Sequence, residues 1–381
     1  MNSVFLISDN VITSLGFTTR ENAAKMREKC SGVMLSEDSF ISPIPFYASL
    51  VNTPLLEEAF GSLNAQAEYT RLEKMLITSI SEALRSANVD PSSDTTLFII
   101  STAKGNIDLL EERLKGRFPK ERLKAAVMAK VVSSFFKNPN PPLVVSNACI
   151  SGSVSLLLGK RLLEGGRYKN IVVAGGDVIS EFTVSGFQSF KAIGSGPCRP
   201  YDEARDGISL GEGAATVILS VVPGPKGAIA LKGGAVTNDA NHISGPSRTG
   251  EGLFLAINGA LNDASLAPEE IDYISGHGTA TNYNDEMESK AIHSARLEQV
   301  PMNSLKGYIG HTLGAAGIAE SVMATYSMKH DILFATAGFS KMGVTQPVNV
   351  LSDNLEKKVK KVLKTAAGFG GCNAALIFEK Q

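Results

Sequence analysis

The stretch PLVVSNACISGSVSLLLGKRLLEGGRYKNIVVAGG, residues 142–176, decides the fold. Its first run, 142–148, and its last, 170–176, are short, apolar and rich in Val, which is typical of buried strands. Between them, residues 151–167 carry apolar side chains at intervals of three and four, the spacing of a helix. A strand, a helix and a strand in this order indicate an α/β protein.

The same alternation extends along the chain. Further strands are expected at 96–101, 214–222, 228–236 and 272–278, and further helices at 69–89, 250–266 and 314–331. The pairing of a helix with a following strand recurs at an offset of roughly 175 residues, far more than the ~20–50 residues of a solenoid repeat. We interpret this as a duplicated α/β unit, and the Pro- and Gly-rich segment 221–227 is the predicted junction.

Composition excludes several classes of protein. The 381 residues, at about 100–200 per core-forming unit, suit two or three such units. With 37 Lys+Arg and 38 Asp+Glu the net charge is -1, so nucleic acid or an anionic membrane meets no overall attraction. Four scattered cysteines show neither a metal-like spacing nor a disulfide framework. Because we find no signal peptide and no membrane-spanning run, we expect a cytoplasmic location.

Cys149 is the first candidate for chemistry. It lies where the strand 142–148 turns into a helix, the arrangement of a nucleophile elbow. The free N–H groups and the dipole of a helix N-terminus favour a thiolate, so we expect a lowered pKa and a reactive sulfur. A buried structural cysteine is the alternative. Cys30, Cys198 and Cys372 have weaker claims, since none of them follows a strand in this way.

Two histidines lie at similar positions. His277 ends a predicted strand, and His311 lies in a turn before a predicted helix. Such strand-end positions are where α/β sheets place groups that contact ligands. Glycines beside both rings would let a substrate approach the backbone closely: Gly276, Gly278, Gly310 and Gly314. Two isolated histidines without a carboxylate do not fit a metal site.

Five segments in order carry a family resemblance: NACISG, RPYDEARDGISLGEGAA, GHGTATNYNDEMES, KGYIGHTLGAAGIAE and GFGGCNAALIF. Together they resemble the elongating β-ketoacyl-acyl-carrier-protein synthases of the thiolase superfamily, from about the first strand to the last residues. The resemblance implies a duplicated αβαβα five-layer sandwich. Its N-terminal half, 1–222, would carry the nucleophile, and its C-terminal half, 223–381, the two histidines.

The resemblance also implies the reaction and its residues. An acyl thioester on Cys149 would condense with malonyl carrier protein after decarboxylation, with no metal or organic cofactor. His277 and His311 would each donate an Nε2–H group to the thioester oxygen of the enolate, which needs donors positioned in advance. The backbone N–H groups of Cys149 and Phe369 would hold the acyl carbonyl oxygen, and Phe369 would also act as the gate between the acyl and malonyl sides.

Further residues match family positions. Lys306 and Glu320, five residues before and nine after His311, correspond to a buried ion pair that orients the imidazole; two unrelated surface charges are the alternative. Thr279 and Thr281 match the hydroxyls that bind the pantetheine arm. The resemblance implies three more substrate-binding positions: Phe187, Gly310 and Gly370.

Partners are also implied by the resemblance. Acyl carrier proteins are acidic, and Lys191 matches a docking arginine, while Arg71 and Lys74 lie on a helix that resembles another part of the docking surface. Ordinary solvated charges are the alternative explanation for all three. Arg205 and Asp206 are expected to brace a loop through a structural ion pair. A homodimer, or a heterodimer with a related synthase subunit, is expected from the family.

The chain also departs from the family. The segment 104–143 is shorter and more basic than usual, Ala367 replaces a second Phe, and Asn147 replaces a Thr. These departures suit a synthase of polyene-like or polyketide-like chains as readily as a housekeeping fatty acid enzyme. A degradative thiolase is one alternative, although Cys372 lies on the wrong side of GFGG for its second cysteine. A subunit like a chain-length factor is the other, although such subunits lack the nucleophile that Cys149 provides.

Overall fold

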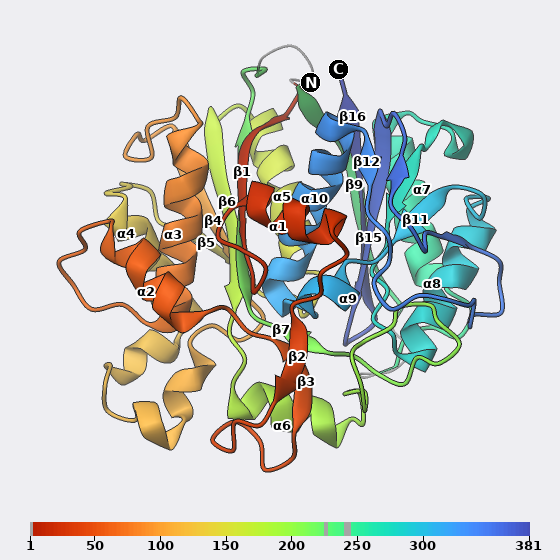
Figure 1. Cartoon of the computed structure of the whole chain (residues 1–381). Coiled ribbons are helices and arrows are strands. Elements are labelled where there is room, and N and C mark those ends of the chain that lie inside the picture. Colours follow the sequence, from red (N-terminus) through yellow and green to blue (C-terminus); the bar gives the residue numbers. More distant parts are fainter. Residues whose placement is uncertain (1–2, 225–227, 240–244) are drawn as a thin grey trace.

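The computed structural model describes residues 3–224, 228–239 and 245–381, which fold into layers of helices and strands (Figure 1). Most strands of this part of the chain form one sheet of 11 strands, in the order β13-β11-β10-β15-β16-β9-β1-β8-β6-β4-β5. The sheet consists of two halves that meet where β1 pairs with β9, with Phe5 opposite Ala230.

The two halves repeat one topology. The N-terminal half contains β1 (Phe5–Ile12), β8 (Gly213–Ser220), β6 (Asn170–Asp177), β4 (Thr96–Ser101) and β5 (Leu143–Val145). The C-terminal half contains β9 (Ile229–Asn238), β16 (Cys372–Lys380), β15 (Lys361–Gly368), β10 (Tyr273–Ser275) and β11 (Pro301–Asn303), followed by β13 (Asn349–Val350). In each half the first three strands pair antiparallel and the last three pair parallel. The predicted duplication is confirmed by this matching pattern.

Helices form the other three layers. The outer layer beside the N-terminal half contains α3 (Arg71–Arg85) and α4 (Ala125–Phe135), and the one beside the C-terminal half contains α7 (Glu251–Ala264) and α8 (Asn282–Ser294). Two central helices, α5 (Ser151–Glu164) and α10 (Ala316–His330), contact each other and strands of both halves. Figure 1 shows α5 and α10 between the strands, with α3 and α4 on one side and α7 and α8 on the other. The αβαβα sandwich is therefore confirmed.

Shorter elements complete the described part of the chain. A three-stranded sheet contains β2 (Val33–Ser36), β3 (Phe46–Ser49) and β7 (Leu210–Gly211), and β12 (Ile332–Leu333) pairs with β14 (Leu355–Glu356). The remaining helices are α1 (Thr19–Arg27), α2 (Thr53–Gly61), α6 (Glu181–Ser189) and α9 (Lys306–Ile309). Single 3-10 turns occur at η1 (Ile107–Leu110), η2 (Glu112–Leu114), η3 (Lys120–Leu123), η4 (Pro268–Glu270) and η5 (Leu313–Ala315).

Strand alternation divides the core into layers. In β4, Leu97 and Ile99 join the central apolar cluster around α5 and α10, while Phe98 and Ile100 join the outer cluster under α3 and α4. Successive side chains of a strand point to opposite faces, so a strand buried on both faces is apolar throughout. This is why the uninterrupted run TLFIIS indicates a strand.

The predicted elements occur with small differences in length. The strand predicted at 96–101 has those bounds in the structure, and the strand predicted at 142–148 is limited to β5, because residues 146–148 form the turn before α5. Of the predicted junction 221–227, residues 225–227 lie outside the described residues.

The predicted Arg205–Asp206 ion pair is wrong. Nη1 of Arg205 donates to the carbonyl oxygens of Asp202 at 3.0 Å and Gly343 at 2.6 Å. Asp206 instead accepts from the backbone N–H of Ser195 at 2.8 Å. The two side chains brace separate loops, each through bonds to backbone groups.

The two central helices approach each other through glycine. A Cβ atom on Gly317 would lie 2.4 Å from the backbone nitrogen of Ser153, and one on Gly152 would lie 2.8 Å from that of Ile318. Real Cβ atoms do not approach backbone this closely, so only glycine fits. The first turns of α5 and α10 therefore pack backbone against backbone, and the residues that precede these turns are brought together.

We expect Gly317→Ala to lower the free energy of unfolding by about 1–3 kcal/mol, the usual cost of forcing atoms into a packed core. Gly186→Ala, in α6, is the matched control, because a Cβ there has no neighbour within 4 Å. Replacing that glycine should raise helix stability by up to about 1 kcal/mol. Urea unfolding followed by circular dichroism compares the two, and equal effects would contradict the close helix contact.

Candidate active site

Cys149 lies on a strained turn between β5 and α5. The preceding residue, Ala148, has a φ of 44°, in the left-handed region that non-glycine residues rarely adopt. Cys149 itself is buried, and the backbone N–H of Phe369 is close enough to its sulfur to lower the pKa of the thiol. The strand, sharp turn and helix predicted from the sequence are present.

The expected direction of the Cys149 pKa shift is wrong. Burial raises the pKa of the thiol to about 12, and the nearby Cys372 also raises it. The positive charge of Lys306 and the N–H of Phe369 lower it by less. Desolvation disfavours a charged sulfur more than its position at a helix N-terminus favours it. The resting site therefore contains a neutral thiol, which must lose its proton during the reaction.

His277 follows β10 in a loop fixed by carboxylates of α8. The backbone N–H groups of His277 and Gly278 each donate to Glu288 at 2.8 Å. Those of Thr279 and Ala280 donate to Asp285 at 2.8 and 3.1 Å. Sequence reasoning missed both carboxylates. Their spacing of three residues on one helix face within NDEMES is a signal that could have indicated them.

His311 lies beside His277. The two ring centroids are 5.2 Å apart and the ring planes are at 84°. Within the described ranges neither ring nitrogen of His311 has a hydrogen-bond partner, although its side chain is only 1% exposed. Buried polar atoms are nearly always hydrogen-bonded, and exceptions often mark sites of binding or catalysis. The His311 ring can therefore offer a hydrogen bond to a bound substrate.

Lys306 determines which nitrogen of His277 carries the proton. Its Nζ lies 3.2 Å from Nδ1 of His277 and also donates to the carbonyl oxygen of that residue. An ammonium group only donates, so Nδ1 accepts and a neutral ring carries its proton on Nε2. The predicted pair of Lys306 with Glu320 is present at 2.6 Å. It contacts the His277 ring, however, whereas the sequence pointed to His311.

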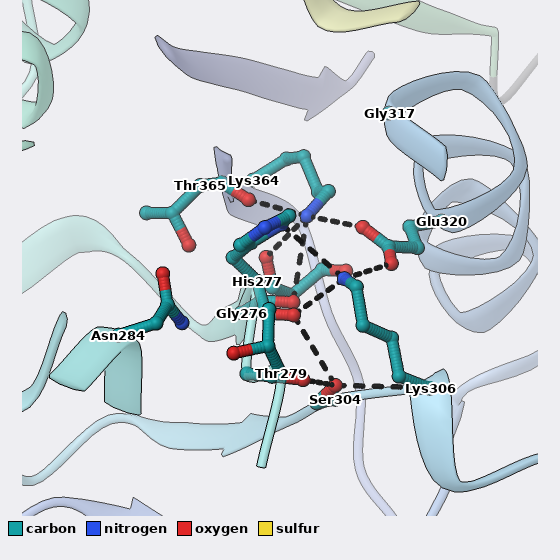
Figure 2. A network of polar contacts seen from close by, with 12 residues as sticks. Gly276, His277, Thr279, Asn284, Ser304, Lys306, Gly317, Glu320, Lys364 and Thr365 are labelled. Carbon is teal, nitrogen blue, oxygen red and sulfur yellow. Dashed lines mark hydrogen bonds and ion pairs between the residues drawn. The ribbon is translucent and has the colours of Figure 1, made fainter. Parts of the chain in front are cut away.

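A second buried lysine completes this network. Lys364 Nζ lies 2.7 Å from Oε2 of Glu320, and both lysines of the network have fully buried side chains. Figure 2 shows Glu320 between Lys306 and Lys364, close to His277. Sequence reasoning missed Lys364. A single charged residue inside the apolar pattern of a central strand, KVLKTAAG, is the signal that could have indicated it.

Both imidazoles are neutral at physiological pH. Burial lowers the pKa of His277 and of His311 well below the usual value, and the positive charges of Lys306 and Lys364 lower both further. The neutral His277 ring donates from Nε2 while Lys306 occupies its Nδ1. The neutral His311 ring, whose nitrogens have no partner among the described residues, can donate from one nitrogen and accept a proton on the other. The pair can therefore stabilise negative charge on an oxygen.

Aromatic rings surround Phe369. Its ring centroid lies 5.5 Å from that of Phe187 and 5.4 Å from that of Phe190. Phe190 is 55% exposed and was not predicted. Cys372 also contacts this loop, with its Sγ 3.4 Å from the carbonyl oxygen of Phe369. Burial raises the pKa of the Cys372 thiol to about 11, so it is a poor source of a thiolate base.

The remaining substrate-binding candidates lie in three loops. The hydroxyl groups of Thr279 and Thr281 are 2.8 Å apart, and that of Thr281 also caps α8. Gly310, directly before His311, has a φ of 64°, and a Cβ there would lie 2.4 Å from the carbonyl oxygen of Leu210. Gly370 has a φ of 88° with nothing near its missing Cβ. The roles of these four residues toward a substrate stay predictions.

The three predicted docking residues differ in availability. Lys191 is exposed at the end of α6. Arg71 is bound within the protein, with Nη2 2.6 Å from both Glu212 and the carbonyl oxygen of Val51, so its expected docking role does not fit. Lys74 pairs with Glu57 at 2.6 Å and is only 16% exposed.

Metal clusters and membrane spans are both absent from the described residues. In residues 3–224, 228–239 and 245–381, no group of three or more His, Cys, Asp or Glu side chains is placed to hold a metal ion. No helix in these ranges is long and apolar enough to cross a membrane.

Comparison with known proteins identifies the family. The chain matches the N-terminal domain of β-ketoacyl synthases over residues 26–222 and their C-terminal domain over residues 229–340. It therefore belongs to the β-ketoacyl synthases of the thiolase superfamily, an acyltransferase family.

Individual relatives agree with this. A mitochondrial 3-oxoacyl-[acyl-carrier-protein] synthase of Arabidopsis thaliana is 31% identical over 64% of this chain and 57% of its own length. The ketoacyl synthase alpha subunit of the tetracenomycin polyketide synthase of Streptomyces glaucescens is 31% identical over 63% of this chain and 60% of its own. The chain thus spans less than two thirds of these relatives. A ketosynthase solved in complex with its chain length factor, from Xenorhabdus doucetiae, shares the fold with a TM-score of 0.90 at 24% identity, covering 100% of this chain and 98% of that one.

We expect alkylation of Cys149 by iodoacetamide to be slow at neutral pH and to accelerate about tenfold per pH unit, because only the thiolate reacts and burial raises its pKa to about 12. Peptide mapping by mass spectrometry gives the rate, and the exposed Cys30 in the same digest reports on reagent activity. A Cys149 rate that levels off near about pH 8.5, where ordinary thiols titrate, would contradict the effect of burial.

Proposed function

We propose that this chain is an active 3-oxoacyl-[acyl-carrier-protein] synthase that performs decarboxylative Claisen condensation. One observation carries the proposal: two neutral imidazoles lie side by side, and both ring nitrogens of His311 are buried without a partner in the described part of the chain. Decarboxylation of a malonyl thioester leaves an enolate oxygen, and a pair of N–H donors is what such an oxygen requires.

The proposed reaction has two stages. Cys149 first takes the acyl group from its carrier: the neutral His311 imidazole accepts the thiol proton as the bond between the acyl group and the carrier sulfur breaks, and then passes this proton to the departing carrier thiolate. Malonyl carrier protein then loses CO2, while His277 and His311 donate to the thioester oxygen of the enolate. The enolate carbon attacks the acyl carbonyl on Cys149, whose oxygen is held by backbone N–H groups of Cys149 and Phe369. The Cys149–acyl bond breaks, the 3-oxoacyl chain leaves on its carrier, and the Cys149 thiolate takes up a proton from water to restore the thiol.

No metal or organic cofactor has a part in this proposal. The charges that develop are those of an enolate and a tetrahedral oxyanion, and the donors named above can stabilise both. We propose that Thr279 and Thr281 bind the pantetheine arm of the carrier. Phe187, Gly310 and Gly370 would line the path of the acyl and malonyl groups, with Phe369 as the gate.

The names of two relatives bear on the class of product. The relatives include both a 3-oxoacyl-[acyl-carrier-protein] synthase and a polyketide synthase subunit. We propose a polyene-like or polyketide-like chain as an equal candidate to a fatty acid, because Ala367 and Asn147 alter the pocket without removing a catalytic group. The cytoplasmic location stays a prediction.

A second related chain is the proposed partner, in a homodimer or a heterodimer. The strand β5 lies at the edge of the 11-stranded sheet and pairs only with β4 among the described strands. Its first residue, Leu143, is 38% exposed. An unpaired strand edge is a template for pairing with another chain. The similar ketosynthase from Xenorhabdus doucetiae was solved in complex with its chain length factor.

The two alternative functions would require different residues at the site. A degradative thiolase needs a second cysteine as its base, and the raised pKa of Cys372 argues against that role. A non-catalytic subunit lacks the nucleophile, whereas Cys149 is present on its turn. Supplying malonyl or acetyl carrier protein and measuring released CO2 separates condensation from thiolysis.

We expect His277→Ala and His311→Ala each to lower the rate of CO2 release from malonyl carrier protein by about 100- to 1000-fold, the usual cost of one oxyanion donor. Acylation of Cys149, measured by mass spectrometry of the intact protein, should persist in His277→Ala, which keeps the His311 imidazole as acceptor of the thiol proton, and should slow in His311→Ala. The controls are wild type and His293→Ala, which changes an exposed histidine of α8. Absence of CO2 from wild type, alone and with a related subunit, would defeat the proposed function.

We expect Lys191→Glu to raise the KM for an acyl carrier protein by about five-fold or more while kcat for a free pantetheine thioester is unchanged, because a surface charge pair typically contributes about 0.2–1 kcal/mol and reversal adds repulsion. Lys358→Glu, at another part of the surface, is the control. If both variants behave alike, or if added salt does not weaken carrier binding by wild type, Lys191 is not a docking residue.

A further inference from the structure

We propose that Lys364 is a positioning residue of the active site, which directs Lys306 toward His277 by holding the far oxygen of Glu320. The inference rests on the proposed function, because the reaction is its main readout. We refer to Lys306, Glu320 and Lys364 together as the buried charge cluster. Lys364 does not contact the reacting atoms in this arrangement and acts through its neighbours.

Lys364 occupies a position that strand alternation assigns to the central core. In β15, Val362 belongs to the central apolar cluster and Leu363 to the outer one. Two residues after Val362, the side chain of Lys364 points to the same central face. It is 0% exposed. Burying a charged group there costs free energy unless the group is paired and hydrogen-bonded. The contacts of Lys364 therefore indicate its role.

Those contacts join three elements at the site. Nζ of Lys364 lies 2.7 Å from Oε2 of Glu320, which comes from α10. The same Nζ donates to the carbonyl oxygens of Ser275 at 3.3 Å and Gly276 at 3.4 Å, the residues directly before His277. Ser275 is also the register partner of Lys364 across β10 and β15. Lys364 thus connects the end of β10 to the central helix.

Each oxygen of the Glu320 carboxylate faces a different lysine. Oε1 accepts from Lys306 at 2.6 Å, and Oε2 is opposed by Lys364. Without Lys364, the buried Oε2 would lack a counter-charge and would compete for the Lys306 ammonium. Lys306 Nζ would then move away from Nδ1 of His277, which lies 3.2 Å from it. The direction of the Lys306 ammonium, and with it the Nε2–H tautomer of His277, depends on Lys364.

The charge balance of the cluster leads to the same expectation. Two lysines face one glutamate, so the buried charge cluster carries an excess positive charge beside both imidazoles. The other carboxylate nearby, Glu288, accepts from Tyr201, Thr365 and the backbone of His277. A positive neighbour disfavours an imidazolium, which keeps both rings neutral, so that each donates from one nitrogen only.

We expect Lys364→Met to lower kcat for CO2 release from malonyl carrier protein by about 10- to 100-fold, as small misplacements of catalytic groups do. KM for malonyl carrier protein and acylation of Cys149 should stay near wild type. Glu320 keeps Lys306 as a partner at 2.6 Å in this variant, so the buried carboxylate retains a counter-charge and the variant should fold. Lys361→Met is the matched control, because it removes a lysine of the same strand whose partner is the surface residue Glu270.

A double variant distinguishes positioning from a structural role. Glu320→Gln alone leaves two buried lysines without their shared carboxylate, and we expect it to be more impaired than Lys364→Met. Adding Lys364→Met to Glu320→Gln should restore at least about ten-fold of the lost rate, since coupled neighbours are not additive. Additive or worse impairment in the double variant, or a wild-type rate in Lys364→Met, would overturn the proposal.

A measurement that does not depend on catalysis tests the positioning role of Lys364 separately from the proposed function. Histidine-selective 15N labelling reports the His277 tautomer by NMR, and we expect the Nδ1 signal to change in Lys364→Met but not in Lys361→Met. An unchanged tautomer would overturn the positioning role even in an active enzyme, whereas a changed tautomer in a chain that releases no CO2 would defeat only the proposed function. If Lys364→Met does not fold, Lys364→Gln carries the same comparisons.

Discussion

The close packing of α5 against α10 is the constraint on which the site depends. Each half of the duplicated fold contributes one central helix, and each helix follows a turn that carries a reactive residue, Cys149 in one half and His311 in the other. Gly152 and Gly317 let the two backbones meet where any larger residue would separate them. A Cβ on Gly152 would also lie 3.1 Å from the carbonyl oxygen of Gly314, so this contact packs the turn after Cys149 against the turn after His311.

Packing this close also excludes water, and exclusion of water determines the charge states. Desolvation holds His277 and His311 neutral and keeps Cys149 as a thiol. In the buried charge cluster beside these rings, Glu320 is paired with a lysine on each side. A site that must stabilise transient negative charge therefore begins with neutral donors and a fixed positive background. Donors of this kind need no reorganisation when the oxyanion forms.

Much of the fold could be predicted from the sequence because its strands are buried on both faces. Runs such as TLFIIS are apolar at every position, and the helices between them keep the three- and four-residue spacing of an apolar stripe. The site was predicted in its main parts for a different reason, since Cys149, His277 and His311 lie in short glycine-rich segments that resemble one family. The structure brings His277, His311, Lys306 and Glu320 together although they come from separate segments of the sequence.

The features that sequence reasoning missed depend on which side chains are buried in the tertiary structure. The helix N-terminus that follows Cys149 predicts a lowered pKa for its thiol, but a local argument cannot weigh the helix dipole against complete desolvation. Arg71 lies on a helix that was expected to form part of a docking surface. Its guanidinium group is instead bound to Glu212, which is far away in the sequence. Lys364 looked like one of several lysines in KKVKKVLK, and only its place on the central face distinguishes it from Lys361, three residues away. In a strand that is buried on both faces, a charged residue at the end of the strand can reach solvent, whereas one on the central face is buried and can organise a site.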